Sequence, residues 1–228
     1  MSLIKDKISK ILLVNKPVDW TSFDVVKKIR GLMKKKYSLK KIKVGHAGTL
    51  DPKASGLLII CTGEKTKQMK LFECLDKKYL ATIKIGAITD SFDSETEEYN
   101  KKTYKHLSNE KIRFVFSEFI GLQDQIPPIY SAIKVNGERL YKKARRGEKN
   151  FELKTRRINI NNLNILDIKL PFIQFEVECS KGTYIRSLAN DIGQKLLCGA
   201  YLSALTRESI GHYKLENAVN IDHISQYL

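Results

Sequence analysis

Asp51 is the residue best suited to chemistry, because the residues around it restrict its backbone. It lies in a segment that runs from Val44 to Gly56, with Pro52 directly after it. Proline pushes the preceding residue toward extended conformations, and Gly45 and Gly48 can adopt backbone angles that other residues avoid. A single carboxylate held on such a loop is typical of a functional site. The alternative is an ordinary Asx-type turn or a helix cap.

Arg186 is the second candidate, because its expected position in a helix is unfavourable for a cation. It lies three residues after Thr183, the expected N-cap, where a capping box would place Glu or Gln. A positive charge in the first helical turn opposes the helix dipole. A carboxylate from elsewhere in the chain, such as Asp51, would account for it, and the alternative is that Arg186 points to solvent.

A basic stretch from Lys134 to Arg157 suits contact with RNA. Tyr130 and Tyr141 are interleaved with its cations, and aromatic rings can stack on unpaired bases while cations neutralise phosphates. Pro127-Pro128 and Gly137 indicate an excursion from the core, and a merely soluble loop is the alternative. The basic residues are Lys134, Arg139, Lys142, Lys143, Arg145, Arg146, Lys149, Lys154, Arg156 and Arg157.

The overall charge points to the same class of partner. The 228 residues carry 41 Lys and Arg against 25 Asp and Glu, a formal net charge of +16, which favours a polyanionic partner. The alternative is that this positive charge arises from compositional drift toward lysine and not from a polyanionic partner. With 42% hydrophobic residues the chain can bury a substantial core, so disorder and coiled coil fit poorly.

The cysteines and histidines indicate neither a metal site nor a disulfide framework. The cysteines form no CxxC pair and are expected to be buried thiols, and the histidines show no ligand spacing. We therefore expect no metal. No signal peptide or run of transmembrane length is evident, so we expect a cytoplasmic protein without a membrane partner. The residues concerned are Cys61, Cys74, Cys179, Cys198, His46, His106, His212 and His223.

Hydrophobic patterning predicts a mixed α/β fold of the α+β type around a largely antiparallel sheet. The expected strands cover Ile11–Val14, Leu57–Ile60, the region of Tyr79–Ile85, and Ile173–Cys179. Three helices are expected, one capped at Thr21-Ser22, one from Ser108 to Gly121, and one after Thr183 that closes near Gly199. No internal repeat or linker appears, so residues 1–228 are expected to form one domain.

Several segments match one known pattern in order. Residues 45–56 follow Gly-His-x-Gly-x-Leu-Asp-Pro-x-Ala-x-Gly. The others are Asn15-Lys16-Pro17 with Thr21-Ser22, Lys78-Tyr79, Gln125-Ile126-Pro127-Pro128 with Tyr130-Ser131-Ala132-x-Lys134, and Lys181-Gly182-Thr183-Tyr184-Ile185-Arg186. Together they resemble the TruB family of tRNA pseudouridine synthases. Five ordered motifs are far more specific than any one of them.

The resemblance implies the pseudouridine synthase fold, with a cleft across a mixed sheet, and an isomerase that needs no cofactor or metal. Its implied reaction converts the T-loop uridine at tRNA position 55 to pseudouridine. Asp51 would be the nucleophile and would act on a flipped-out uridine. The reaction would go through either a sugar adduct or a glycal intermediate, and the resemblance does not decide between these two routes. Tyr79 would stack on the base, and Arg186 would pair with Asp51.

The same resemblance implies a set of residues that bind RNA or the target uridine. An RNA-gripping insertion would span about residues 124–157, the partner would be the tRNA T-arm, and no obligate protein partner is evident. The implied binding residues are His46, Tyr184, Asp90, Lys16, Lys134, Arg145 and Arg146.

Three departures from the family pattern stand out. The stretch from Thr89 to Glu95 lacks a glycine usually found after it, and Thr206 replaces a second arginine expected to contact RNA. The chain ends at Leu228, where the family continues into a PUA domain, so we expect that domain to be absent and tRNA affinity to be reduced. Two further hypotheses are an RNA-binding or tRNA-folding factor with little catalysis, and a nucleoside or glycoside hydrolase.

Overall fold

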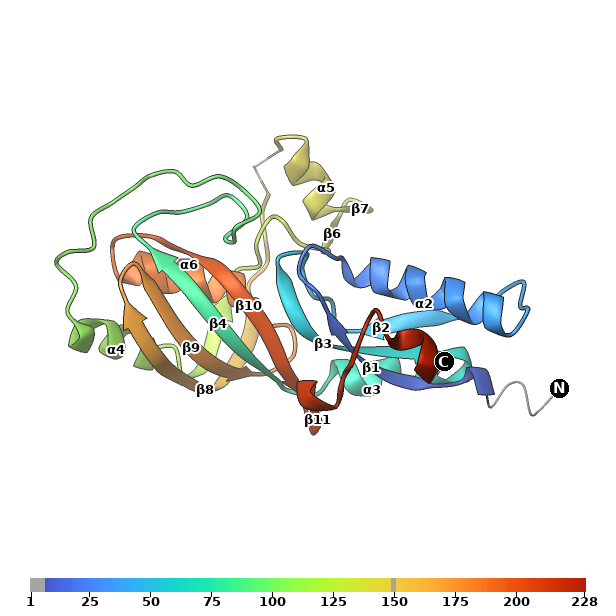
Figure 1. The fold of residues 1–228 in the computed structure, drawn as a ribbon. Helices are drawn as coiled ribbons and strands as arrows, with labels where there is room; N and C mark the ends of the chain where they lie inside the picture. The colour runs from blue at the N-terminus through green and yellow to red at the C-terminus, as the bar shows by residue number, and fades with distance from the viewer. Residues whose placement is uncertain (1–6, 149–150) are drawn as a thin grey trace. The chain divides into compact units, whose positions relative to one another are not determined.

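The computed structural model describes residues 7–148 and 151–228, so Lys149 of the basic stretch lies outside the described residues. The chain divides into two compact units (Figure 1). The first comprises Met1–Leu80 and Leu205–Leu228 and is called the Asp51 unit. The second comprises Ala81–Ala204 and is called the Arg186 unit. Strands β4 (Lys77–Ile85) and β10 (Ala200–Ile210) contribute residues to both.

In the Asp51 unit the sheet is built around β3 (Ala54–Thr62). β1 (Ile11–Lys16) and β2 (Val44–Ala47) pair with it antiparallel, and the start of β3 pairs parallel with β10. The short strand β12 (Val219–Asn220) pairs parallel with β1, and β11 (Tyr213–Lys214) pairs antiparallel with β10. Residues 57–60 of β3 are fully buried, which confirms the predicted buried strand.

Each face of β3 packs against a different helix. Leu58 and Ile60 join a core with the buried residues of α2 (Ser22–Lys36), which lies alongside β2 (Figure 1). Leu57 and Ile59 face the opposite side, where Phe72 of α3 (Met69–Glu73) packs. The unit is completed by three 3₁₀ helices, η1 (Gly63–Gln68), η2 (Leu215–Asn217) and η3 (Ile224–Tyr227).

The N-terminus of α2 is fixed by a capping box. The Thr21 hydroxyl accepts from the backbone N–H of Asp24 at 3.0 Å, and the Asp24 carboxylate accepts from the Thr21 N–H at 2.9 Å. These bonds satisfy donors that a helix start otherwise leaves open. The predicted cap at Thr21 is confirmed, and the helix therefore begins at a defined residue, Ser22.

In the Arg186 unit the strand order is β10-β4-β9-β8-β5. β8 (Arg156–Lys169) and β9 (Phe172–Cys179) form a long antiparallel pair, and β5 (Gly121–Gln125) pairs antiparallel with β8. β9 alternates as predicted, with Phe175 buried against Phe116 of α4 (Asn109–Ser117) at a ring separation of 5.2 Å. The remaining core helix is α6 (Ile185–Lys195).

The expected RNA-gripping insertion contains its own small elements. β6 (Lys134–Val135) and β7 (Glu138–Arg139) form a two-stranded sheet, and α5 (Leu140–Arg145) follows directly. Leu140 and Ala144 of α5 are buried, whereas most of its cations are exposed. The insertion is therefore anchored by one face of a short helix.

The predicted mixed, largely antiparallel sheet is confirmed, but four local predictions are wrong. The N-cap of α6 is Tyr184, because the Thr183 hydroxyl donates instead to the Ser180 carbonyl. The helix after Ser108 ends at Ser117, and Gly121, at φ +95°, opens β5. Helix α6 ends at Lys195 rather than near Gly199. Cys74 is exposed, whereas the other three cysteines are buried as predicted.

Candidate active site

Asp51 is half-buried on a loop, residues 48–53, that we call the Asp51 loop. The first anchor of this loop is Ser22, which is buried at the start of α2. Its hydroxyl accepts from the Leu50 N–H at 2.8 Å and donates to the Leu50 carbonyl at 3.0 Å. Both backbone groups of the residue before Asp51 are therefore fixed to a helix end.

The second anchor is Arg207 of β10, whose side chain is only 1% exposed. Its guanidinium donates to the carbonyls of Gly48 at 3.1 Å, Thr49 at 3.4 Å and Leu57 at 2.7 Å. One rigid fork thus joins the residues before Asp51 to the strand that follows it.

The C-terminal half of the loop is held by backbone contacts and one ion pair. The Asp19 N–H donates to the Pro52 carbonyl at 2.8 Å, and the Ala54 N–H donates to the Asp51 carbonyl at 3.1 Å. Lys53 pairs with Asp19 at 2.8 Å. Because these contacts fix the main chain on both sides of Asp51, its carboxylate projects from a rigid support.

Lys16, at the end of β1, is fully buried, and its expected place in the RNA-facing cleft stays a prediction. Its ammonium donates to the carbonyls of Pro17 at 2.7 Å and Trp20 at 2.6 Å. Burial lowers the pKa of Lys16 to about 8, while attraction to Asp51 partly opposes that shift. Lys16 therefore supports the turn between β1 and α2 and adds positive charge close to Asp51.

This shifted pKa predicts a pH dependence of stability. Between pH 8 and 10.5 the unfolded chain keeps the Lys16 proton while the folded protein releases it. Stability should therefore rise with pH across that window, and the cost of the buried charge is fully present below pH 8. In denaturant titrations, the stability of Lys16→Met relative to the wild type should fall as pH rises from 8 to 10.5. A constant difference would contradict the prediction.

Gly56 lies between the two buried cations, in register with Lys16 on β1 and with Arg207 on β10. Its φ is +104°, and a Cβ placed there would lie 2.4 Å from the Arg207 carbonyl oxygen and 2.6 Å from its nitrogen. Both the backbone angle and the close approach of β10 require glycine. This glycine therefore allows Arg207 to reach the Asp51 loop.

Replacing Gly56 with alanine should destabilise the protein by about 3 kcal/mol, since overpacking adds to the cost of a left-handed backbone. For a chain of this size that lowers Tm by roughly 6–12 °C. Gly31→Ala is the matched control, because a Cβ at Gly31 within α2 meets nothing within 4 Å. The control should stabilise by up to about 1 kcal/mol. Equal Tm changes in the two variants would contradict this account.

His46 and Tyr79 are the other two candidates in the Asp51 unit. His46 lies half-buried on β2, and burial followed by the positive charge of Arg207 lowers its pKa. The neutral imidazole is therefore favoured, and its buried Nδ1 has no hydrogen-bond partner among the described residues. Tyr79 is 8% exposed on β4, where the predicted alternation is confirmed. A neutral imidazole and a phenol ring can both contact an uncharged base.

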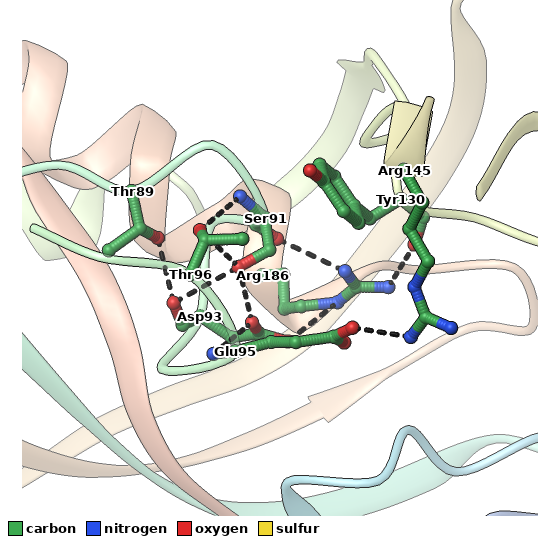
Figure 2. A network of polar contacts seen from close by, with 8 residues as sticks. All are labelled: Thr89, Ser91, Asp93, Glu95, Thr96, Tyr130, Arg145 and Arg186. Atoms are coloured by element: carbon green, nitrogen blue, oxygen red, sulfur yellow. Dashed lines mark hydrogen bonds and ion pairs between the residues drawn. The ribbon is translucent and has the colours of Figure 1, made fainter. Parts of the chain in front are cut away.

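Arg186 forms the centre of a polar network in the other unit (Figure 2). It is 4% exposed and donates to the carbonyls of Ser91 at 3.0 Å and Tyr130 at 2.9 Å. Its Nε lies 3.6 Å from the buried carboxylate of Asp93. Arg186 thus ties the loop of residues 89–96 to the segment that contains Tyr130, and Asp93 is a partner that was not predicted from the sequence.

The Asp-rich loop, residues 89–96, is held by its own hydroxyl groups. Ser91 donates to the Asp93 carboxylate at 2.6 Å, and the Thr89 hydroxyl donates to the Asp93 carbonyl at 2.7 Å (Figure 2). Phe92 takes a φ of +62°. In this loop, which lacks the glycine that usually follows it in the family, the residue with left-handed backbone angles is Phe92. Asp90, expected near the uridine, accepts from the Tyr99 hydroxyl at 2.8 Å.

Tyr184 is positioned by a reciprocal pair of bonds with Gln125. The Gln125 side chain donates to the Tyr184 carbonyl at 3.0 Å and accepts from its N–H at 2.8 Å. The ring of Tyr184 is half-buried, with the Arg156 guanidinium 6.0 Å from its centroid. An aromatic face beside a cation is suited to a nucleotide.

Two arginines of the insertion, Arg145 and Arg146, are already paired with carboxylates. Arg145 pairs with Glu95 of the Asp-rich loop at 2.5 Å, which raises the pKa of Arg145 (Figure 2). Arg146 holds Glu138 through two bonds of 2.8 and 2.9 Å. Both arginines remain more than half exposed, and Lys134 is exposed on β6. RNA phosphates would therefore have to compete with these carboxylates.

Comparison with known proteins places these elements in one family. The model for "TruB family pseudouridylate synthase (N terminal domain)" matches residues 34–185. The tRNA pseudouridine synthase B of Phocaeicola vulgatus is 46% identical over 222 residues, covering 97% of this chain and 94% of its own. The tRNA pseudouridine synthase B of Chlorobaculum tepidum is 48% identical over 213 residues, which cover 93% of this chain and 88% of the Chlorobaculum protein. The chain belongs to the TruB family.

The pseudouridine synthase fold expected of a TruB protein is also confirmed. A chain in the crystal structure of a Cbf5–Nop10–Gar1 complex superposes with a TM-score of 0.73 at 27% identity. The superposition covers 99% of this chain and 56% of that longer chain.

Within this TruB chain, the candidate residues divide between the two units. Asp51, Tyr79, His46 and Lys16 belong to the Asp51 unit. Asp90, Lys134, Arg145, Arg146, Tyr184 and Arg186 belong to the Arg186 unit. The pairing of Asp51 with Arg186 stays a prediction, as do the individual roles of the binding residues. Ser22 and Arg207 were missed as loop anchors, because nothing local in the sequence links them to residues 48–50.

The described residues contain neither a metal-binding cluster nor a membrane-spanning helix. Over residues 7–148 and 151–228, no group of three or more His, Cys, Asp or Glu side chains could hold a metal ion. Of the helices in the part of the chain that the structure describes, none is long and apolar enough to cross a membrane.

Proposed function

We propose that this chain is a tRNA pseudouridine synthase that isomerises the T-loop uridine at tRNA position 55. The observation that carries the proposal is Asp51, which occupies the aspartate of the TruB motif on a loop fixed by Ser22 and Arg207. Relatives named tRNA pseudouridine synthase B match almost the whole chain. A net charge of +16 fits a polyanionic substrate.

In the proposed reaction, the bond between uracil N1 and the sugar C1′ breaks and a bond from C5 to C1′ replaces it. Asp51 acts at the sugar, as a nucleophile or by assisting a glycal route. A rigid main chain around it reduces the entropy lost on reaching the reactive geometry. Arg186 pairs with Asp51 in this proposal and keeps the carboxylate charged and oriented.

The proposed base contacts come from aromatic and neutral side chains. Tyr79 stacks on the uracil, and Tyr184 and Asp90 lie near the flipped nucleotide. His46 stays neutral because burial and Arg207 lower its pKa, so it can enter the RNA loop without an added charge. The uridine must leave its stack at a cost of a few kcal/mol, less for a loop nucleotide. Lys134, Arg145 and Arg146 contact RNA phosphates.

The chemistry offers a direct test, because isomerisation replaces the C5–H bond of uracil and releases that hydrogen to water. An unmodified tRNA transcript labelled with tritium at uracil C5 should release one tritium per tRNA molecule. No free uracil should appear. Release of uracil would instead indicate a hydrolase. Absence of both products, with tRNA still bound, would indicate an RNA-binding factor.

A further inference from the structure

Two buried cations flank the start of β3, directly after the Asp51 loop. Lys16 is 0% exposed and Arg207 is 1% exposed, and both are in register with Gly56. The hydrogen bonds of both side chains go to backbone carbonyls among the described residues. Burying a charge costs several kcal/mol even where carboxylates lie nearby, so these two cations require an explanation beyond simple packing.

Arg207 is the cation with a direct mechanical link to Asp51. Its guanidinium binds the carbonyls of Gly48 and Thr49, the third and second residues before Asp51. Its Nε binds the carbonyl of Leu57 at 2.7 Å, within β3. The planar fork therefore fixes the separation between the loop and the strand, which a flexible ammonium could not do.

Arg207 also acts through charge on the groups around Asp51. Burial is the main cause of the lowered pKa of His46 and of Lys16, and the positive charge of Arg207 lowers both further, so its field reaches across β2 and β1. Attraction to Asp51 opposes part of the shift caused by burial of Lys16, so the Asp51 carboxylate belongs to the same group of charges. Arg207 and Lys16 are therefore two cations among the charged groups around the Asp51 loop.

We propose that Arg207 is a positioning residue for Asp51, holding the carboxylate in its reactive geometry through the carbonyls of Gly48 and Thr49. The inference rests on the proposed function. Arg207 touches no substrate, because it is buried. Its removal should therefore slow the chemical step and leave tRNA binding largely unchanged. A merely structural role would lower the folded fraction and leave the rate of the folded protein unchanged.

Three variants test this proposal. Arg207→Gln removes both the positive charge and the planar guanidinium, whereas Arg207→Lys keeps only the charge. Arg113→Gln is the control. Arg113 lies exposed on α4, in the other unit. Single-turnover tritium release is measured at saturating enzyme, at a temperature where thermal unfolding shows each variant to be folded. The tRNA Kd is measured separately. Arg207→Gln should lower the rate by about 100-fold, the loss expected for a displacement of about 1 Å.

The conservative variant separates the two effects of Arg207. Arg207→Lys should recover part of the rate lost in Arg207→Gln, while its tRNA Kd and that of Arg207→Gln stay near the wild-type value. Arg113→Gln should match the wild type in both measurements. A wild-type rate in Arg207→Lys, or a loss confined to tRNA Kd, would overturn the proposal, even if Arg207→Gln does not fold. An inactive wild type would instead contradict the proposed function itself.

Discussion

Replacing Asp51 with asparagine is expected to abolish pseudouridine formation, with a loss on the order of 10⁴-fold or more. Asparagine has nearly the same shape, and the contacts that hold the Asp51 loop use main-chain groups, Ser22 and Arg207. The loop should therefore keep its conformation, while the side chain loses the negative charge that makes the carboxylate oxygen a nucleophile. Tritium release from C5-labelled tRNA measures the loss, and a filter-binding titration measures tRNA affinity.

The matched control for this prediction is Asp222→Asn. Asp222 is also in the Asp51 unit, but its side chain is 81% exposed and pairs with Lys28 on the surface. Such a pair contributes little to stability, so this variant should keep wild-type activity. tRNA affinity should persist in Asp51→Asn, because phosphate contacts dominate binding. Full activity in Asp51→Asn would contradict the assignment of Asp51 as the nucleophile.

Replacing Arg186 with methionine is expected to cost both activity and stability. The change removes the donors to the carbonyls of Ser91 and Tyr130 and the cation beside buried Asp93. Breaking a buried charge pair typically costs about 3–5 kcal/mol, which lowers Tm by roughly 6–20 °C in a chain of this size. Thermal unfolding followed by circular dichroism measures the stability change.

Arg186→Lys distinguishes the charge of this residue from its geometry. Lysine keeps a cation near Asp93 but cannot donate to Ser91 and Tyr130 from one planar group. We expect a smaller loss of Tm than for methionine, together with a large loss of activity. Arg113→Met, on the exposed surface of α4, is the control and should change neither quantity. Wild-type activity in Arg186→Lys at full folding would show that the guanidinium geometry is not needed.

The sequence predicted those parts of the fold that local patterns determine. The buried run from Leu57 to Ile60 and the alternation of Ile173–Cys179 are set by which neighbours are apolar, so both strands were predicted correctly. The cap at Thr21 was predictable for the same reason, since its partner Asp24 lies only three residues away. By contrast, the Thr183 hydroxyl donates to the Ser180 carbonyl and does not cap the helix, so the predicted N-cap of α6 was one residue too early.

The support of the site was not predictable, because it depends on contacts between distant segments. Arg207 binds carbonyls about 150 residues earlier in the chain, at Gly48, Thr49 and Leu57. Lys16 resembles a surface cation in sequence, yet the turn after β1 encloses its ammonium. Asp51 itself could be singled out as a candidate from local restraint and from the TruB motif, and its role stays a prediction. What holds it in place required the structure.

The most direct test of the central claim is to map pseudouridine at nucleotide resolution in an unmodified tRNA transcript. The wild-type chain and the Asp51→Asn variant are incubated with the same transcript at equal concentration. We expect the wild type to modify one position, the T-loop uridine 55, and Asp51→Asn to modify none. Modification at several unrelated uridines, or equal product from both proteins, would contradict the claim that Asp51 catalyses isomerisation of the T-loop uridine.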